Sequence, residues 1–247
     1  LLGRVYEILG RIDRAIEEMN ILIKKEPKSV NLMIYLARLY SMNAQPEETI
    51  RLIKDAVKID QENDTLYHSL ALAYISVGQY DQAIDKMQKA ISINGNYYQA
   101  YYSLGSLYLS EGKLIKAQDA LKSALLLNST YAKAYGALGA VEQRLGNIIE
   151  SIKNYKKAVE LDSKSYDNHY RLSSIYNINK QYEAAKKAAK ESLNIKRNYA
   201  PAHFELGIAE KSLGNKVAAI ASFENAKKDR KWRESAEYEI DLLSKGL

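Results

Sequence analysis

The chain repeats one chemical pattern every 34 residues, and this period constrains its fold more than any other feature. Rows of 34 residues align without an insertion when they begin at Val30, Asp64, Tyr98, Ala132, Tyr166 and Ala200. A partial row, residues 1–29, comes before them, and another, residues 234–247, comes after them. Because a fixed period of this length is typical of repeat architectures, each row is predicted to be one supersecondary unit.

Several positions of the row are chemically uniform. In the seven rows from 1–29 to 200–233, position 7 is leucine and position 8 is glycine, alanine or serine. Position 11 is tyrosine in five rows, with Glu142 and Glu210 as the departures. Much of the excess of tyrosine over phenylalanine, 20 against 2, therefore reflects one core position that is repeated along the chain.

The spacing of the apolar positions predicts a helical hairpin in each row. Positions 4, 7, 8 and 11 share one face of a helix, and positions 20, 24, 27 and 28 share one face of a second helix. Between them, position 15 is glycine in five rows and Ala44 or Lys180 in two others. Glycine is free to take a positive φ there and to end the first helix. The small residues at positions 8, 20 and 27 let the two helix backbones approach closely.

This pattern resembles the tetratricopeptide repeat family, whose 34-residue row has aromatic, leucine, glycine and tyrosine positions in its first helix and alanine, aromatic and proline positions in its second. The resemblance covers the whole chain. It implies an all-α fold, a right-handed α-solenoid of stacked helix-turn-helix repeats, with a concave side lined by the first helices. Two family columns are weak: the terminal proline survives only as Pro27, and position 4 is never tryptophan.

The predicted organisation is a single array over residues 1–247. It comprises a partial repeat with a truncated first helix at 1–29, full repeats at 30–63, 64–97, 98–131, 132–165, 166–199 and 200–233, and a capping helix at 234–247. In the last full row two apolar positions become Lys227 and Asp229, and this polar break favours a solvating cap. The first row opens in mid-helix, so we expect further repeats or another domain upstream, in a longer protein.

Composition and motifs give little support for catalysis. The chain has no cysteine, which removes disulfides, thiolate metal sites and a cysteine nucleophile. His169 and His203 occupy the same core column, where an aromatic substitute is the simpler interpretation than a metal pair. No glycine-rich phosphate loop is present. We therefore predict no enzyme activity, no cofactor and no metal site, and no apolar run approaches the roughly 18 residues that a membrane span needs.

The net charge of +6 lies entirely in residues 151–247, and the densest basic segment is 227–233, which contains the only tryptophan. A patch for an acidic partner, RNA or a membrane surface is one interpretation. The favoured interpretation is a helix C-terminus, whose dipole attracts cations, on a solvated face. No aromatic platform interleaves the other lysines, so a nucleic-acid partner is not expected.

The resemblance also indicates which side chains line the concave groove. In this family, positions 2, 5, 6, 9, 12 and 13 of the first helix face inward, and we call them the groove columns. The candidates on these columns are Tyr35, Arg38, His68, Leu72, Tyr102, Ser106, Ala140, Arg144, Tyr170, Arg171, Phe204 and Ile208. Two recognition modes of the family are disfavoured. No three consecutive rows carry the lysine, asparagine and arginine set of its carboxylate clamp, and no asparagine recurs at one groove position.

The predicted function is a non-enzymatic scaffold that binds a peptide or partner segment in this groove. Tyrosine and arginine often anchor interfaces, and a floor of small residues suits an amphipathic helix or an extended apolar segment. The competing interpretation is that the groove tyrosines pack inside the superhelix. Two alternative functions are a structural arm of a bacterial cell-envelope machine, for polysaccharide export or pilus assembly, and a targeting module fused to a catalytic domain outside this chain. The cytoplasm and the bacterial periplasm are both compatible with the lack of cysteine.

Overall fold

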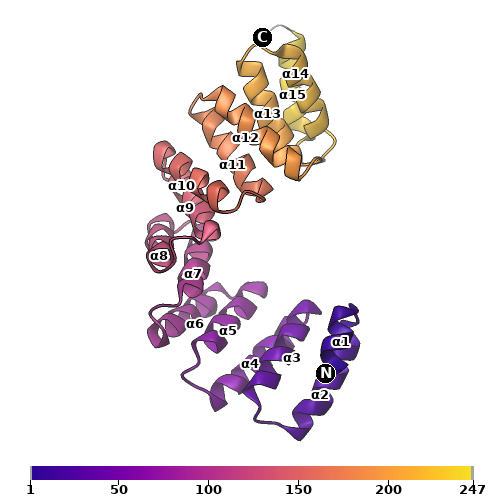
Figure 1. Cartoon of the computed structure of the whole chain (residues 1–247), viewed down its shortest axis with the longest axis vertical. Coiled ribbons are helices and arrows are strands. Elements are labelled where there is room, and N and C mark those ends of the chain that lie inside the picture. The colour runs from indigo at the N-terminus through magenta and orange to yellow at the C-terminus, as the bar shows by residue number, and fades with distance from the viewer. Residues whose placement is uncertain (1, 246–247) are drawn as a thin grey trace. The chain divides into compact units, whose positions relative to one another are not determined.

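The structure is a computed structural model that describes residues 2–245, and every regular element in this range is an α-helix (Figure 1). Leu1, Gly246 and Leu247 lie outside the described residues. One residue of the predicted partial repeat 1–29 and two residues of the predicted capping helix 234–247 therefore lie outside them as well. The chain divides into two compact units, residues 1–111 and 112–247, and the predicted repeat 98–131 has one helix in each.

The first unit contains seven described helices. They are α1 (Leu2–Ile8), α2 (Ile12–Lys25), α3 (Val30–Met42), α4 (Pro46–Ile59), α5 (Asp64–Ser76), α6 (Tyr80–Ile93) and α7 (Tyr98–Ser110). Helices α1 and α2, α3 and α4, and α5 and α6 form hairpins. Each second helix also packs on the first helix of the next hairpin.

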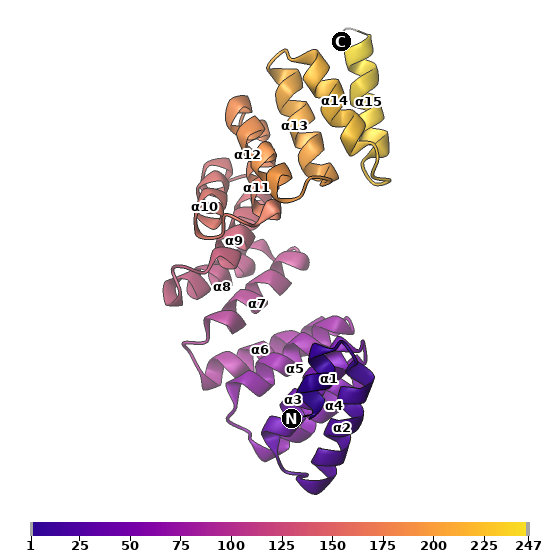
Figure 2. The same ribbon diagram turned by 45° about the vertical axis from the view of Figure 1, so that its right-hand side comes forward.

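The second unit follows the same rule. Its described helices are α8 (Leu114–Leu127), α9 (Ala132–Arg144), α10 (Ile148–Leu161), α11 (Tyr166–Ile178), α12 (Tyr182–Ile195), α13 (Ala200–Ser212), α14 (Lys216–Ala226) and α15 (Arg233–Ser244). Helix α15 is the last described helix and packs on α14, and Figures 1 and 2 both show α13, α14 and α15 side by side. Within each unit the chain is thus an α-helical repeat stack, as predicted.

The turn inside each hairpin uses a left-handed backbone conformation at position 15, as the sequence predicts. The five glycines at this position have φ between 70° and 82°. The two departures keep the same backbone, since φ is 53° at Ala44 and 58° at Lys180. The turn geometry is therefore imposed by the packing of the two helices even where a Cβ atom makes it unfavourable.

The core of each hairpin is built from the predicted columns. Leu36, Leu70, Leu104, Leu138 and Leu172 at position 7 are all buried, and so are the alanines at positions 20 and 27. Leu2, which occupies position 7 of the first row, is 58% exposed. Burial of the repeated apolar columns is the main favourable contribution to the stability of such a stack.

The two glutamates at the tyrosine position are buried and hydrogen-bonded. Glu142 is 4% exposed and accepts hydrogen bonds from Gln118 Nε2 at 2.7 Å and Asn147 Nδ2 at 2.8 Å. Glu210 accepts one from Asn215 Nδ2 at 2.7 Å. Both asparagines stand at the start of the second helix, a position that is asparagine only in these two rows. A buried carboxylate therefore replaces tyrosine only where the same row supplies an amide donor.

Candidate functional site

All twelve predicted groove residues lie on the first helix of a hairpin. Helices α3, α5 and α7 of the first unit carry Tyr35, Arg38, His68, Leu72, Tyr102 and Ser106. Helices α9, α11 and α13 of the second unit carry Ala140, Arg144, Tyr170, Arg171, Phe204 and Ile208. Each unit therefore has its own candidate surface.

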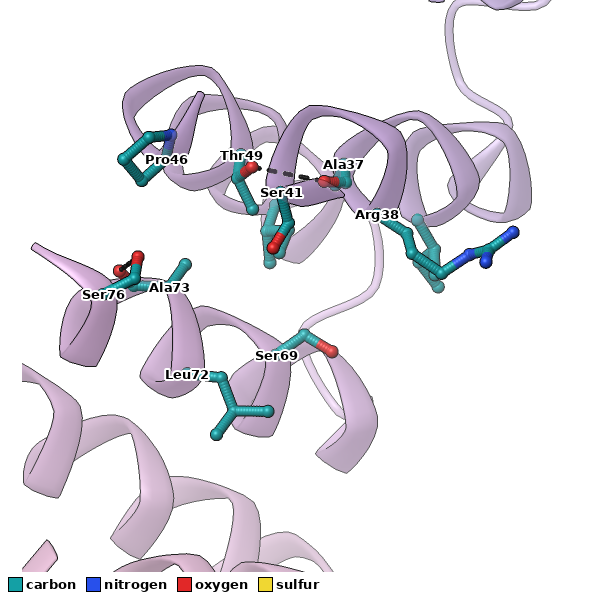
Figure 3. Close-up of a pocket in the computed structure, with 11 residues that line it drawn as sticks. Ala37, Arg38, Ser41, Pro46, Thr49, Ser69, Leu72, Ala73 and Ser76 are labelled. Atoms are coloured by element: carbon teal, nitrogen blue, oxygen red, sulfur yellow. Dashed lines mark hydrogen bonds between the residues drawn. The ribbon is translucent and has the colours of Figure 1, made fainter. Parts of the chain in front are cut away.

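The first unit contains a pocket of about 270 Å³ between α3, α4 and α5 (Figure 3). The lining residues are Ile34, Ala37, Arg38, Ser41, Pro46, Thr49, Ile53, Ser69, Leu72, Ala73 and Ser76. Six of them, Ile34, Arg38, Ser41, Ser69, Leu72 and Ser76, belong to groove columns. The pocket therefore lies on the face that the family resemblance assigns to partner binding, and it brings together the predicted residues Arg38 and Leu72.

This pocket exists because two facing side chains are short. At other junctions between rows, a longer polar residue at position 12 bonds to a residue at position 6 of the next row. Examples are Asn177 with Glu205 at 2.8 Å and Lys211 with Glu239 at 2.8 Å. The corresponding pair between α3 and α5 is Ser41 and Ser69. Their side chains leave the space between the two helices unfilled.

The walls of the pocket are mainly apolar. Ile34, Ile53 and Leu72 supply branched side chains, and Leu72 is 47% exposed. The hydroxyl of Thr49 turns away from the opening, because its Oγ1 donates to the carbonyl oxygen of Ala37 at 3.2 Å. When another apolar group covers an exposed leucine beside a hollow apolar wall, the free energy of the system falls because apolar surface is removed from water.

Arg38 holds a carboxylate at the edge of the pocket. Its Nη1 and Nη2 atoms donate to Oε1 and Oε2 of Glu7, at 2.6 and 2.8 Å. Tyr35 donates its hydroxyl to Oε2 of the same residue at 2.7 Å. The hydrogen bond from Arg38 is the main reason why the pKa of Glu7 lies below its ordinary value, and the Tyr35 hydroxyl adds to it. Glu7 is therefore ionised at neutral pH.

His68 is a structural member of the first unit. Its Nε2 lies 2.9 Å from the Ser103 hydroxyl, and its Nδ1 lies 3.1 Å from the Tyr97 hydroxyl. The Tyr97 ring meets the imidazole edge to face, with the ring centroids 5.1 Å apart. Burial lowers the pKa of His68, so the ring is neutral at neutral pH. Tyr102 and Ser106, one repeat further on, are half-buried on α7.

In the second unit, Phe204 and Ile208 pack into the end of the stack. The Phe204 ring contacts Phe223 and Trp232, with centroid distances of 5.4 and 4.9 Å. Ile208 packs against the same cluster, which includes Ala236 of α15. The only tryptophan of the basic segment is thus a packing residue.

Tyr170 and Arg171 belong to a polar and aromatic cluster on α11. The Tyr170 ring meets Tyr199 edge to face at 5.6 Å, and Arg171 Nε donates to Asp167 at 2.6 Å. Tyr199 donates its hydroxyl to the same carboxylate at 3.1 Å. These contacts join α11 to Tyr199, the last residue of the same repeat, which directly precedes α13, and this favours a packing role for both predicted residues. Ala140 is half-buried beside the Tyr155 cluster, and Arg144 is exposed at the end of α9.

Sequence reasoning missed four residues that shape the candidate site of the first unit: Glu7, Ser41, Ser69 and Ile53. Ser41 and Ser69 were on the groove columns, and their small size in both facing positions was the available signal. Glu7 also occupies a groove column, but its pairing depends on the stacking of α1 against α3, which no single row encodes. Ile53 lies on a second helix and reaches the pocket from behind.

No cluster of three or more histidine, aspartate or glutamate side chains in residues 2–245 could hold a metal ion. None of the helices in this range is long and apolar enough to cross a membrane.

Models of the tetratricopeptide repeat family match residues 65–97, 86–119, 132–165 and 166–199. Among solved structures, MamA is 30% identical over 66% of this chain and 88% of its own, with a TM-score of 0.57. YrrB, a tetratricopeptide repeat protein described as having an unusual peptide-binding site, is 18% identical over 75% of this chain and 97% of its own, with a TM-score of 0.64.

The pilF protein of Pseudomonas aeruginosa is 13% identical over 85% of this chain and 97% of its own, with a TM-score of 0.75. At this level of identity, the likeness to YrrB and pilF shows the fold alone. No curated protein sequence matches the chain significantly.

Proposed function

The chain belongs to the tetratricopeptide repeat family, and from this premise we propose that it is a protein-interaction scaffold that anchors a partner segment in the pocket between α3 and α5. Repeats of this family generally serve as non-catalytic interaction modules. The partner segment is a peptide or an exposed stretch of a folded protein. No catalytic step is part of this function.

The observation that carries the proposal is the composition of the pocket lining. Six residues from the groove columns of two successive repeats line one hollow, and one of them, Leu72, presents 47% of its surface to solvent. A leucine with this exposure contributes less to the hairpin core than the buried leucines at position 7, such as Leu36 and Leu138. Its position indicates an apolar contact that is completed by a partner.

The size of the pocket favours a side chain over a free small molecule. Ligand pockets for drug-sized molecules occupy about 300–1,000 Å³, and this pocket lies just below that range at about 270 Å³. One bulky apolar side chain, presented by a peptide backbone that runs across α3 and α5, would cover the exposed Leu72. YrrB, which shares the fold, is described as binding a peptide, and this supports the same class of ligand here.

Selection from a random peptide library displayed on phage tests this function. The wild-type chain should enrich peptides with a shared bulky apolar residue. The Leu72→Asp variant should lose at least about tenfold in affinity for them, because a charge in the pocket leaves the apolar side chain without a site. The matched control is Leu126→Asp on α8, where leucine is 88% exposed and lies outside the groove columns.

Enriched peptides that bind Leu72→Asp as well as they bind the wild type would overturn the proposal. Failure to enrich any peptide would overturn it too. The envelope-arm and targeting-module alternatives stay predictions.

A further inference from the structure

The carboxylate of Glu7 is held by three donors that all come from α3. Arg38 donates from both terminal nitrogens, at 2.6 and 2.8 Å, and Tyr35 donates its hydroxyl at 2.7 Å. A two-pronged guanidinium contact of this kind is the geometry by which arginine selects carboxylates over other acceptors. The guanidinium also lies 5.1 Å from the centre of the Tyr35 ring, and this contact fixes its orientation. Helix α3 thus carries a preformed carboxylate site.

This carboxylate site and the apolar pocket share one residue. Arg38 lines the pocket together with Ile34 and Leu72. In Figure 3, Arg38 lies at one end of the pocket, whereas Pro46 and Ser76 lie at the other end. A ligand that places an apolar side chain in the pocket therefore brings its neighbouring atoms within reach of the guanidinium.

The ion pair between Arg38 and Glu7 lies at the surface of the unit. The side chain of Arg38 is 51% exposed and that of Glu7 is 18% exposed. Solvent and an incoming carboxylate can therefore reach the guanidinium, and rotation of the Glu7 side chain about its own bonds is enough to release it. The carboxylate of Glu7 can leave α3 without unfolding of the hairpins behind it.

We propose that Glu7 is an internal stand-in for a carboxylate of the partner. A peptide that carries a carboxylate next to a bulky apolar side chain displaces Glu7 from Tyr35 and Arg38 and places its apolar side chain in the pocket. This inference rests on the proposed function and names its ligand class. It differs from the clamp of lysines and asparagines that the groove columns lack, because its donors are one tyrosine and one arginine of a single helix.

Competition between Glu7 and the ligand has a measurable consequence. In the free protein, most molecules have the carboxylate site occupied, and the apparent affinity for an acidic ligand is reduced by the fraction that is open. Removal of the Glu7 charge opens the site in every molecule. The affinity for an acidic peptide should then rise, whereas the affinity for a neutral peptide of the same shape should stay unchanged.

Three synthetic peptides, followed by chemical shifts of the backbone amides, test this inference. The first is acetyl-Gly-Ser-Leu-Glu-amide, with an acidic side chain. The second is acetyl-Gly-Ser-Leu with a free C-terminal carboxylate. The third is acetyl-Gly-Ser-Leu-Gln-amide, which is neutral. Each is titrated into the full chain as wild type, Glu7→Gln and Arg38→Gln. The matched control is Arg51→Gln, because Arg51 pairs with Glu48 on the exposed face of α4.

We expect Glu7→Gln to bind at least one acidic peptide about tenfold more tightly than the wild type does, with no change for the neutral peptide. The two acidic peptides show whether a side chain or a chain end is preferred. Arg38→Gln should bind all three peptides alike, and Arg51→Gln should behave as the wild type. Because Arg38→Gln leaves α1 and its charge in place, it tests the carboxylate site even if Glu7→Gln loosens α1.

Two results would overturn the inference. One is equal affinity of Glu7→Gln and the wild type for the acidic peptides. The other is an acid preference that survives in Arg38→Gln. If the peptides bind in a Leu72-dependent way but without any preference for acid, the inference fails and the proposed scaffold function stands. If library selection also fails, both fail.

Discussion

Gly207 and Phe223 are matched in size across the last hairpin. A Cβ atom at Gly207 would lie 2.5 Å from Cε1 of Phe223, well inside van der Waals contact. The Phe223 ring is completely buried. Gly139 and Tyr155 show the same arrangement two rows earlier, where a Cβ atom at Gly139 would lie 3.0 Å from Cδ1 of Tyr155. Position 8 is therefore small because position 24 of the same row fills the space that a side chain there would occupy.

Gly207→Ala should destabilise the chain by about 1–3 kcal/mol, because an added methyl group in a tightly packed core forces the facing ring out of place. Urea unfolding followed by circular dichroism measures the change. The control is Gly95→Ala, since a Cβ atom there meets nothing within 4 Å. In the double variant Gly207→Ala with Phe223→Leu, part of the loss should be recovered relative to the sum of the single changes. Additive losses would contradict this account of the glycine.

The repeat period made the fold predictable because each row is a different sequence that forms the same helical hairpin. Comparison of the same position in seven rows shows a preference for one residue type that no single row would establish. Leu36 and Leu138 could be assigned to the core on this ground alone. What the columns hide is the compensation inside one row. Glu142 departs from the tyrosine of its column, and Asn147, five residues later in the same row, donates a hydrogen bond to it.

Ala44 and Lys180 carry the positive φ that glycine carries in the other rows. Left-handed backbone costs an ordinary residue about 1–2 kcal/mol of conformational strain, and substitution by glycine removes this strain. The greater entropy of glycine in the unfolded chain cancels part of the resulting gain in stability. We therefore expect Ala44→Gly and Lys180→Gly each to raise the free energy of unfolding, by up to about 1 kcal/mol. Gly78→Ala should do the opposite, and urea midpoints measure all three. A lower midpoint for both glycine variants would show that these turns are not strained.

Asn147 supplies a donor to a carboxylate that is 4% exposed. Asn147→Ala should cost about 1–3 kcal/mol, because Glu142 then keeps a buried oxygen without that partner. Asn215→Ala should have an effect of the same sign through Glu210. The control is Asn225→Ala, whose side chain bonds to a backbone carbonyl on an exposed surface of α14. Equal unfolding midpoints for Asn147→Ala and Asn225→Ala would contradict the role given to the amide.

The candidate site was less predictable than the fold, for a physical reason. The groove columns predict which side chains lie on one face of the stack, but not which of these side chains contact each other. Phe204 and Tyr170 were chosen as groove aromatics, but they contact Trp232 and Tyr199, which lie at the ends of the same repeats, directly before α15 and α13. The pocket beside Leu72 arises from the shortness of Ser41 and Ser69, a property of a pair in different rows. Such pairs depend on how the rows stack.

His68 provides the last prediction, which concerns pH. Burial lowers the pKa of its imidazole from 6.5, with the charge of Asp64 as a smaller opposing influence. The unfolded chain therefore takes up the proton first as the pH falls. The contribution of neutral His68 to stability should be complete above about pH 6.5 and should decline below it, towards the lower pKa of the folded state.

NMR titration of the ring Cε1 proton should place the midpoint of His68 below 6.5. In urea unfolding, the wild type should lose stability relative to His68→Gln between pH 7 and 5, because glutamine has no proton to bind. The Ser103 and Tyr97 hydroxyls that contact the imidazole remain available to the glutamine amide. A His68 midpoint at or above 6.5, with a stability difference that does not change with pH, would show that the ring is exposed. His68 would then return to the groove as a candidate contact for the partner.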